Sequence, residues 1–182
     1  MNLVRISLSH LSVVVFSVLV SAGPLSSPRV SSVELQDVSE AAAYNAKGLE
    51  SYKSGNYQDA VKSYTQAVKL KKDYAEAYYN LGDAYLQLKQ YKQAFEAYKQ
   101  AVKHQPNSSI AYNNMGTAYF KLREHQKAIE AYKEAIRLDP QLTSTYYNLA
   151  ATYVERGNEQ AALAQYRILK NSMPSWHTNF IF

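Results

Sequence analysis

Apolar and polar residues alternate with a helical period along most of this chain. Between Ala75 and Leu88, large apolar side chains recur at steps of three and four residues: Tyr78, Leu81, Tyr85 and Leu88. This spacing places them on one face of a helix. A second segment of the same character runs from Tyr91 to His104, and the polar pair Lys89-Gln90 separates the two segments. The pattern predicts two helices joined by a short turn, which is a helical hairpin.

The hairpin pattern recurs every thirty-four residues. Four copies follow one another without a gap, over residues 41–74, 75–108, 109–142 and 143–176. Self-similarity at a fixed period of this size is typical of stacked repeat arrays. One hairpin cannot bury both of its apolar faces, so the stability of such an array comes from stacking. We therefore expect one all-α domain, a solenoid, over residues 41–176.

Four positions of the repeat keep the same type of residue when each copy is numbered from one to thirty-four. Positions 8 and 20 are small in every copy: Gly48, Gly82, Gly116, Ala150, Ala60, Ala94, Ala128 and Ala162. Positions 4 and 24 are tyrosine in every copy: Tyr44, Tyr78, Tyr112, Tyr146, Tyr64, Tyr98, Tyr132 and Tyr166. Small residues let two helices approach closely, and tyrosines fill the space beside them while keeping a hydroxyl that needs a partner.

This arrangement of small and large positions resembles the tetratricopeptide repeat over residues 41–176. Proline follows the expected second helix at Pro106, Pro140 and Pro174, where it ends the helical hydrogen-bond ladder. The first copy departs from the pattern with Lys72 at the proline position. The resemblance implies an α-solenoid of four helix-turn-helix hairpins that forms a right-handed superhelical segment. It also implies a non-enzymatic scaffold that binds an extended peptide or a partner protein.

In tetratricopeptide arrays the first helices line a concave groove. By this resemblance, the candidate peptide-binding residues are Asn45, Tyr79, Asn80, Asp83, Asn113, Asn114, Thr117, Tyr147 and Asn148. Among them, Asn80, Asn114 and Asn148 share position 6 and form a ladder one repeat apart. An amide offers both a donor and an acceptor, which suits an extended peptide backbone. Asparagine is also simply a common residue at this position, and the sequence leaves both interpretations open.

Some tetratricopeptide proteins hold the carboxylate tail of a chaperone in a clamp of Lys, Asn and Arg side chains. The clamp uses positions 5 and 9 of one copy, position 6 of the next, and positions 2 and 6 of the third. Those positions hold Asn45, Leu49, Asn80, Ile110 and Asn114, of which only Asn80 matches. We therefore do not expect this chain to bind such tails.

The residue pattern does not indicate catalysis or a bound cofactor. The chain has no cysteine and four histidines, and none of the histidines has the paired spacing of a metal site. His125 takes the position that tyrosine holds in two other copies, which predicts a packing role. No glycine-rich phosphate loop occurs. We expect no catalytic residue, no metal and no cofactor.

The charge of the chain favours a protein partner over a nucleic acid. Twenty Lys and Arg stand against 15 Asp and Glu, for a formal charge of +5. This mild excess is not a nucleic-acid signature. Most basic residues fall on the expected second helices, where Glu96, Glu130 and Glu134 interrupt them. Interspersed charges of this kind are typical of a solvated surface.

The first residues have the layout of a secretory signal. Arg5 precedes an apolar stretch from Leu11 to Val20, and the small residues Ser21, Ala22 and Gly23 follow it. This layout predicts a signal peptide over residues 1–22, a polar linker over residues 23–40, and export to the periplasm or out of the cell. Sequencing of the mature amino terminus tests this, since a mature chain that begins at Met1 would contradict it.

Two alternatives for this leader stay open. A membrane span needs about 20 mostly apolar residues, and the apolar stretch reaches that length only by including Ser7, Ser9 and His10. An uncleaved membrane anchor is therefore the weaker interpretation, and membrane contact is expected only in that case. A mitochondrial presequence is the third, although residues 13–20 are too continuously apolar for an amphipathic helix.

Residues 177–182 form a short tail that ends in Phe180-Ile181-Phe182. Terminal repeats need a polar outer face or an additional cap. One interpretation is that Trp176 and the tail fold over the last hairpin, and we prefer it. The other is that the uncovered end of the fourth copy is a surface for self-association. The second gives the alternative function, a structural subunit that assembles through its convex face or its carboxyl-terminal end.

Overall fold

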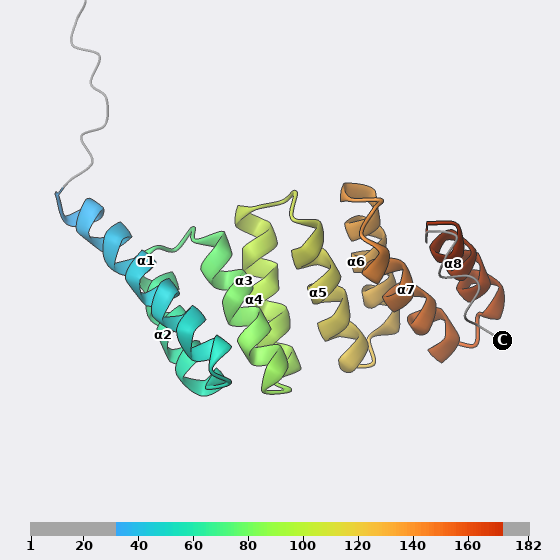
Figure 1. Cartoon of the computed structure of the whole chain (residues 1–182), viewed down its shortest axis with the longest axis horizontal. Coiled ribbons are helices and arrows are strands. Elements are labelled where there is room, and N and C mark those ends of the chain that lie inside the picture. Colours follow the sequence, from blue (N-terminus) through green and yellow to red (C-terminus); the bar gives the residue numbers. More distant parts are fainter. Residues whose placement is uncertain (1–31, 173–182) are drawn as a thin grey trace, which may run out of the picture. The chain divides into compact units, whose positions relative to one another are not determined.

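The computed structural model describes residues 32–172, and these form helices without a strand among them. The helices are α1 (Ser32–Lys53), α2 (Tyr57–Leu70), α3 (Ala75–Gln87), α4 (Tyr91–His104), α5 (Ser109–Lys121), α6 (His125–Leu138), α7 (Thr143–Glu155) and α8 (Glu159–Ser172). Consecutive helices pair into hairpins, and each hairpin packs on the next in chain order (Figure 1). The expected all-α solenoid is confirmed.

The helix ends in the middle of the array fall where the repeat pattern predicted them. The second helix of the second copy covers Tyr91–His104, as expected. Pro106 and Pro140 each lie two residues after the end of a helix, α4 and α6 respectively. The third proline, Pro174, lies outside the described residues.

Helix α1 begins earlier than the sequence predicted. The linker expected over residues 23–40 was wrong from Ser32 onward, because α1 begins there. Residues 32–40 contain neither glycine nor proline and include Glu, Leu and Gln, which favour helix. Val33, Leu35 and Val38 are exposed, and Figure 1 shows this part of α1 extending beyond α2. Local propensity and continuity with the packed part of α1 therefore support these turns.

The two ends of the chain lie outside the described residues. These ends include the expected signal peptide over residues 1–22, the first part of the linker and the tail over residues 177–182. Within residues 32–172, no helix combines the length and the apolar character that crossing a membrane requires.

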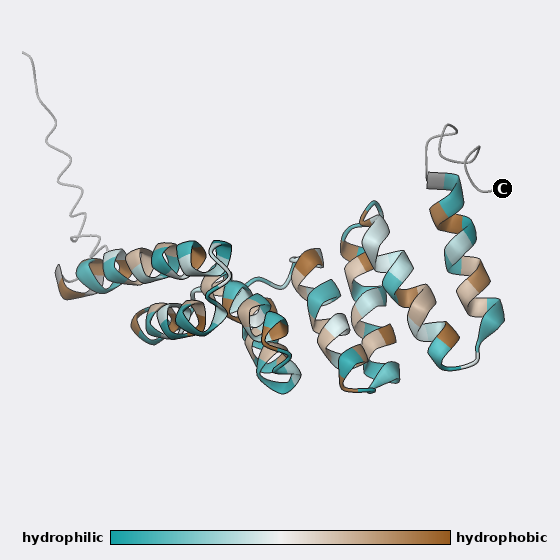
Figure 2. Cartoon of the chain, turned by 60° about the horizontal axis from the view of Figure 1, so that its bottom comes forward, coloured by the Kyte–Doolittle hydropathy of each residue, from teal (hydrophilic) through white to brown (hydrophobic). Residues whose placement is uncertain are grey.

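Polar and apolar residues are mixed on every helix (Figure 2). The apolar contact that recurs in the first three hairpins is between a glycine and a tyrosine. A Cβ atom added to the position 8 glycine would lie 2.6, 2.5 or 2.7 Å from the ring of the position 24 tyrosine, in the pairs Gly48–Tyr64, Gly82–Tyr98 and Gly116–Tyr132. These tyrosines are at most 1% exposed. In the fourth copy, Ala150 replaces the glycine and Tyr166 is 53% exposed. The close approach expected at position 8 is confirmed.

Each hairpin turn holds one residue in the left-handed backbone conformation. These residues share one repeat position: Gly55, Lys89, Arg123 and Gly157, with φ of 77°, 59°, 61° and 70°. The turn closes the helix as expected, since the backbone N–H of Gln90 donates to the carbonyl of Tyr85 at 2.9 Å. Glycine adopts this backbone conformation without strain, whereas a residue with a Cβ atom adopts it at an energetic cost. Lys89 and Arg123 are therefore strained.

We predict that Gly82→Ala destabilises the array by about 1–3 kcal/mol, because its new Cβ overlaps the ring of Tyr98, which has no room to move. At an ordinary helix position the sign is opposite, because alanine favours helix over glycine by about 1 kcal/mol. Urea unfolding followed by circular dichroism measures the change. The variant Ala46→Gly, at an exposed position of α1, serves as the control. A Gly82→Ala variant as stable as the wild type would contradict the packing described for Tyr98.

We predict that Lys89→Gly and Arg123→Gly each stabilise the array by about 0.5–1 kcal/mol. Glycine removes a left-handed strain of about 1–2 kcal/mol, and its greater freedom in the unfolded chain offsets part of this gain. Thermal unfolding measures the change. Lys71→Gly is the matched control, since Lys71 has a φ of −124° and carries no such strain. An equal shift of the melting temperature in all three variants would refute the explanation.

Candidate functional site

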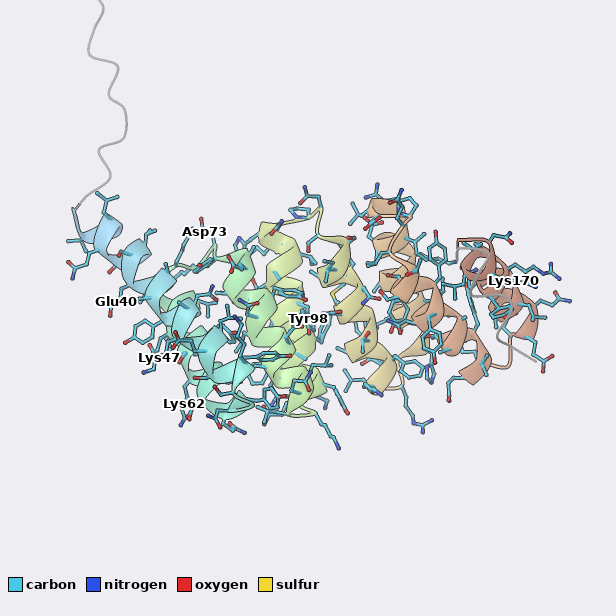
Figure 3. The ribbon with its side chains drawn as sticks, in the orientation of Figure 1. Glu40, Lys47, Lys62, Asp73, Tyr98 and Lys170 are labelled. Atoms are coloured by element: carbon cyan, nitrogen blue, oxygen red, sulfur yellow. The ribbon has the colours of Figure 1, made fainter. Side chains whose placement is uncertain are left out.

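The first helices of the hairpins form one continuous inner layer. Helix α1 packs against α3, α3 against α5, and α5 against α7, and no such packing links successive second helices to the same extent among the described residues. The first helices are therefore closer together than the second helices, so they lie on the inner side of the stack. Figure 3 shows Tyr98 in the middle of the stack, with Lys47 and Lys170 on its first and last hairpins. The predicted binding residues lie on this inner layer.

The asparagine ladder at position 6 joins neighbouring repeats. The Nδ2 atom of each member donates to the position 5 residue of the preceding copy, thirty-five positions earlier. The pairs are Asn80 Nδ2–Asn45 Oδ1 at 3.1 Å, Asn114 Nδ2–Tyr79 Oη at 3.2 Å and Asn148 Nδ2–Asn113 Oδ1 at 3.0 Å. Each amide of the ladder thus donates at least one hydrogen bond within the protein, and these amides hold successive first helices together.

Two of the predicted binding residues lie beneath the surface. Asn45 is 6% exposed and Asn113 is 9% exposed. The Nδ2 atom of Asn45 donates to Glu76 Oε1 at 3.2 Å, and that of Asn113 donates to Asn114 Oδ1 at 3.0 Å. Their amides join neighbouring repeats, and both side chains are almost inaccessible from the surface.

Asp83 holds a half-buried carboxyl group at the centre of the inner layer. Its Oδ1 atom accepts a hydrogen bond from the hydroxyl of Tyr98 at 2.5 Å and another from Asn114 Nδ2 at 3.0 Å. Burial raises the pKa of the Asp83 carboxyl above its ordinary value, although hydrogen bonds from Tyr98, Tyr79 and Asn114 act in the opposite direction. The same burial, together with the Asp83 charge, raises the pKa of Tyr98 and of Tyr79. The carboxylate is therefore held at an energetic cost.

A small cavity opens beside this carboxyl group. It has a volume of about 90 Å³ and is lined by Leu49, Tyr52, Tyr64, Asn80 and Asp83, between α1 and α3. The Tyr98 hydroxyl and the Asn114 amide both contact Asp83 Oδ1, and Tyr79 also hydrogen-bonds the carboxyl group. The cavity therefore gives access to the carboxyl group of Asp83 from the space between α1 and α3.

The bond between Asp83 and Tyr98 was missed by the sequence interpretation. The tyrosine at position 24 of a copy can contact the side chain at position 9 of the same copy, fifteen residues earlier. In the third copy the hydroxyl of Tyr132 donates to Thr117 Oγ1 at 3.3 Å. The other two copies have Leu49 and Ala151 at position 9, which offer no side-chain acceptor. A polar residue at position 9, fifteen residues before the tyrosine of position 24, is the sequence signal that would have predicted this hydrogen bond.

Apolar side chains run along the inner layer beside the amides. Position 12 carries Tyr52, Leu86, Phe120 and Val154, one from each copy. The predicted binding residue Tyr147 lies at the carboxyl-terminal end of this row and is 68% exposed. The inner layer therefore offers a polar row and an apolar row side by side.

The other chemical groups fit structural roles. The ring of His125 meets that of Phe120 edge-on at 5.6 Å, as the expected packing role requires. Exposed ion pairs lie mainly on the second helices, such as Lys62–Asp59 at 2.8 Å and Lys99–Glu96 at 3.8 Å, where they contribute little to stability. Within residues 32–172 no group of His, Cys, Asp and Glu side chains could hold a metal ion.

We predict that Asp83→Asn leaves the array at least as stable as the wild type at neutral pH. The raised pKa means that the folded chain binds a proton at a pH where the unfolded chain has released it, so ionisation of Asp83 lowers the free energy of unfolding. As pH falls through the raised pKa, the wild type should gain on the variant. Urea unfolding at a series of pH values measures this gap, with Asp73→Asn, in the exposed turn before α3, as the control. A gap that widens on acidification would contradict the assignment.

Comparisons with known proteins identify the family of this repeat. Family models described as "Tetratricopeptide repeat" match residues 45–109, 109–142 and 131–164. A search of curated proteins finds no match.

Several solved structures share the fold. The chain is similar to the crystal structure of MamA, with 27% identity and a TM-score of 0.72 over 77% of this chain and 82% of that one. It is similar to the Arabidopsis OM64 TPR domain, with 27% identity and a TM-score of 0.62 over 64% of this chain and 96% of that one. The first TPR of Spaghetti (RPAP3), bound to the HSP90 peptide SRMEEVD, has 23% identity and a TM-score of 0.64 over 66% of this chain and 95% of that one, and shows the fold alone. Because the repeat models together match residues 45–164, the chain belongs to the tetratricopeptide repeat family and is built as a protein–protein interaction scaffold.

Proposed function

We propose that this chain is a non-enzymatic scaffold that holds an extended segment of a partner protein along the inner layer of α1, α3, α5 and α7. The observation that carries the proposal is the carboxyl group of Asp83. It lies half-buried on this layer, beside a cavity of about 90 Å³, and its Oδ1 atom is held by Tyr98 and Asn114. Titratable groups whose pKa is perturbed gather at functional sites, and burial raises the pKa of Asp83.

Packing alone does not require an acid at this position. The other copies place Leu49, Thr117 and Ala151 there. A threonine is sufficient to accept the hydroxyl of the facing tyrosine, as Thr117 does for Tyr132. Aspartate brings a desolvation cost that threonine does not bring. A role in recognition accounts for this cost, because a cationic group of a partner at the carboxyl group would offset it.

The remaining inner surface suits an extended segment. Asn80 and Asn148 donate through Nδ2, and no hydrogen bond from the described residues reaches their Oδ1 atoms. These oxygens lie two repeats apart and are available to backbone N–H groups. The apolar row that includes Leu86 and Phe120 runs beside them and can receive apolar side chains of the same segment.

The chemistry of the site also indicates the kind of segment. Asp83 and the exposed Glu76 give the centre of the inner layer an acidic character. A cationic side chain or an N–H group suits such a centre, and a charge-assisted hydrogen bond to a carboxylate is stronger than a neutral one. A carboxylate tail would meet like charge. The proposal is therefore a partner segment that presents donors, with a lysine or arginine at the Asp83 cavity.

Peptides selected from a random library on the wild-type chain test this proposal. We predict that Asp83→Asn weakens their binding tenfold or more, a loss of about 1.4 kcal/mol, while Asp73→Asn binds as the wild type does. Asp83→Asn is a cleaner test than alanine at Asn114, whose amide joins two repeats. Isothermal titration of the same peptides gives the affinities. Equal affinity for all three chains would show that the Asp83 cavity is not the site.

A further inference from the structure

A second cavity opens on the inner layer, at the amino-terminal ends of α3 and α5. It has a volume of about 190 Å³, and its walls include Tyr79, Ala101, Ser108, Ile110 and Ala111. We call it the Ser108 pocket. Ile110 is 51% exposed although it is a large apolar residue. The pocket therefore offers apolar surface that the described part of the chain leaves open to solvent.

The Ser108 pocket lies where a neighbouring junction has a large side chain. Ser108 is position 34 of its copy, where the first and third copies have Tyr74 and Leu142. Tyr74 packs against the apolar core of the first two copies, and its hydroxyl accepts a hydrogen bond from Asn45 Nδ2 at 3.3 Å. Ser108 has no ring to place there, and its hydroxyl accepts a hydrogen bond from the backbone N–H of Ala111 at 3.3 Å. The ring that fills the first junction is thus absent from the second.

Tyr79 lines the Ser108 pocket without filling it. Its hydroxyl accepts a hydrogen bond from Asn114 Nδ2 at 3.2 Å and also hydrogen-bonds the carboxyl group of Asp83. The ring centroid lies 6.0 Å from that of Tyr98. These contacts hold the Tyr79 side chain toward Asp83. Tyr79 is therefore common to both places, and the Ser108 pocket is continuous with the proposed binding surface.

We propose that the Ser108 pocket receives a tyrosine side chain of the partner segment. This inference rests on the proposed function, because it assigns a second contact to the same segment. A cavity of about 150 Å³ is enough to hold a benzene ring, so the Ser108 pocket has room for one aromatic ring. Glu76 and Gln105 also line the pocket, and both side chains offer acceptors for a phenol hydroxyl. The partner thus supplies at the second junction the kind of ring that Tyr74 supplies at the first.

Helix α3 sets the spacing between the two contacts. The Asp83 cavity lies between α1 and α3, and the Ser108 pocket lies between α3 and α5. Glu76 and Asp83 belong to these two places and are separated by about 10 Å along the axis of α3, at 1.5 Å per residue. An extended segment advances about 3.3 Å per residue. The tyrosine and the cationic residue of the partner are therefore about three positions apart or more.

p-Cresol, which is the tyrosine side chain as a free molecule, tests the pocket without a partner. In a chain with ¹³C in its isoleucine δ1-methyl groups, we predict that millimolar p-cresol shifts the NMR signal of Ile110 and not those of Ile129 and Ile136. Ser108→Tyr fills the pocket from within and should abolish the shift. Asn107→Tyr is the matched control, since it adds the same ring at an exposed residue that does not line the pocket, and it should keep the shift. An Ile110 signal that stays in place in the wild type, or moves equally in Ser108→Tyr, overturns the proposal.

The Ser108→Tyr variant keeps a sequence that the array already accepts. Tyr74 and Leu142 precede α3 and α7 without a side-chain cap, so α5 forms without the hydrogen bond from Ser108. Circular dichroism verifies the fold. Ser108→Leu, which copies the residue of the third copy, repeats the test with a second side chain in the pocket.

Peptides selected on the wild-type chain test whether the pocket serves the partner segment. We predict that they carry a tyrosine, and that Ser108→Tyr weakens their binding about tenfold or more, as the loss of a central contact does. Replacing the peptide tyrosine by alanine should weaken binding to the wild type equally and have no further effect on Ser108→Tyr, because both changes remove one contact. Isothermal titration measures the four affinities.

Two outcomes separate this inference from the function on which it rests. If Ser108→Tyr binds the peptides as the wild type does while Asp83→Asn binds them more weakly, the pocket is not a contact of the partner and the proposed function stands. If Ser108→Tyr weakens binding and Asp83→Asn does not, the pocket stands and the role proposed for Asp83 fails.

Discussion

The contact between a glycine on the first helix and a tyrosine ring on the second determines the geometry of every complete hairpin in this protein. With no Cβ at Gly48, Gly82 or Gly116, the ring lies directly on the backbone of the facing helix. This contact fixes the distance between the two helices, and so it also fixes the depth at which the tyrosine hydroxyl emerges. Where Ala150 replaces glycine, the tyrosine is half exposed, and an apolar cavity opens at the same hairpin.

The binding surface follows from that geometry. When the ring of the position 24 tyrosine packs on the glycine, its hydroxyl reaches the side chain at position 9 of the first helix, as in Tyr98–Asp83 and Tyr132–Thr117. The residue at that position then decides the chemistry of the repeat: leucine leaves it apolar, threonine satisfies the hydroxyl, and Asp83 adds a charge. The first three repeats therefore differ in chemistry on one repeated frame, and under the proposed function a partner would be recognised by the order in which an apolar residue, a carboxylate and a hydroxyl occur.

The repeat period made the fold readable from the sequence, because each copy tests the pattern of the others. The helix ends in the second copy agree with the structure for that reason. The start of α1 was misjudged because residues 32–40 lie outside the period and pack against little, so only local propensity acts there. The left-handed turn residues Lys89 and Arg123 were not expected either, since closure of the hairpin overrides their preference.

The candidate site was predictable in its location and not in its use. The sequence predicted that Asn80, Asn114 and Asn148 occupy equivalent positions in successive repeats. In the structure they lie at successive junctions between first helices. Their donors bond to the preceding repeat, which depends on distances between helices that no single copy contains. Asp83 appeared as one groove residue among several, since its partnership with Tyr98 requires the seated ring.

The amide ladder has a mechanical consequence. Its bonds span the junctions between repeats and lie on the inner layer, which is the proposed binding surface. A bound segment that takes one of these amide hydrogens for itself releases a bond between two hairpins, and a segment that engages only the free oxygens leaves that bond in place. Occupancy of the proposed binding surface and stiffness of the junctions are thus thermodynamically linked. The stiffness of the array would therefore depend on which atoms of the ladder a partner engages.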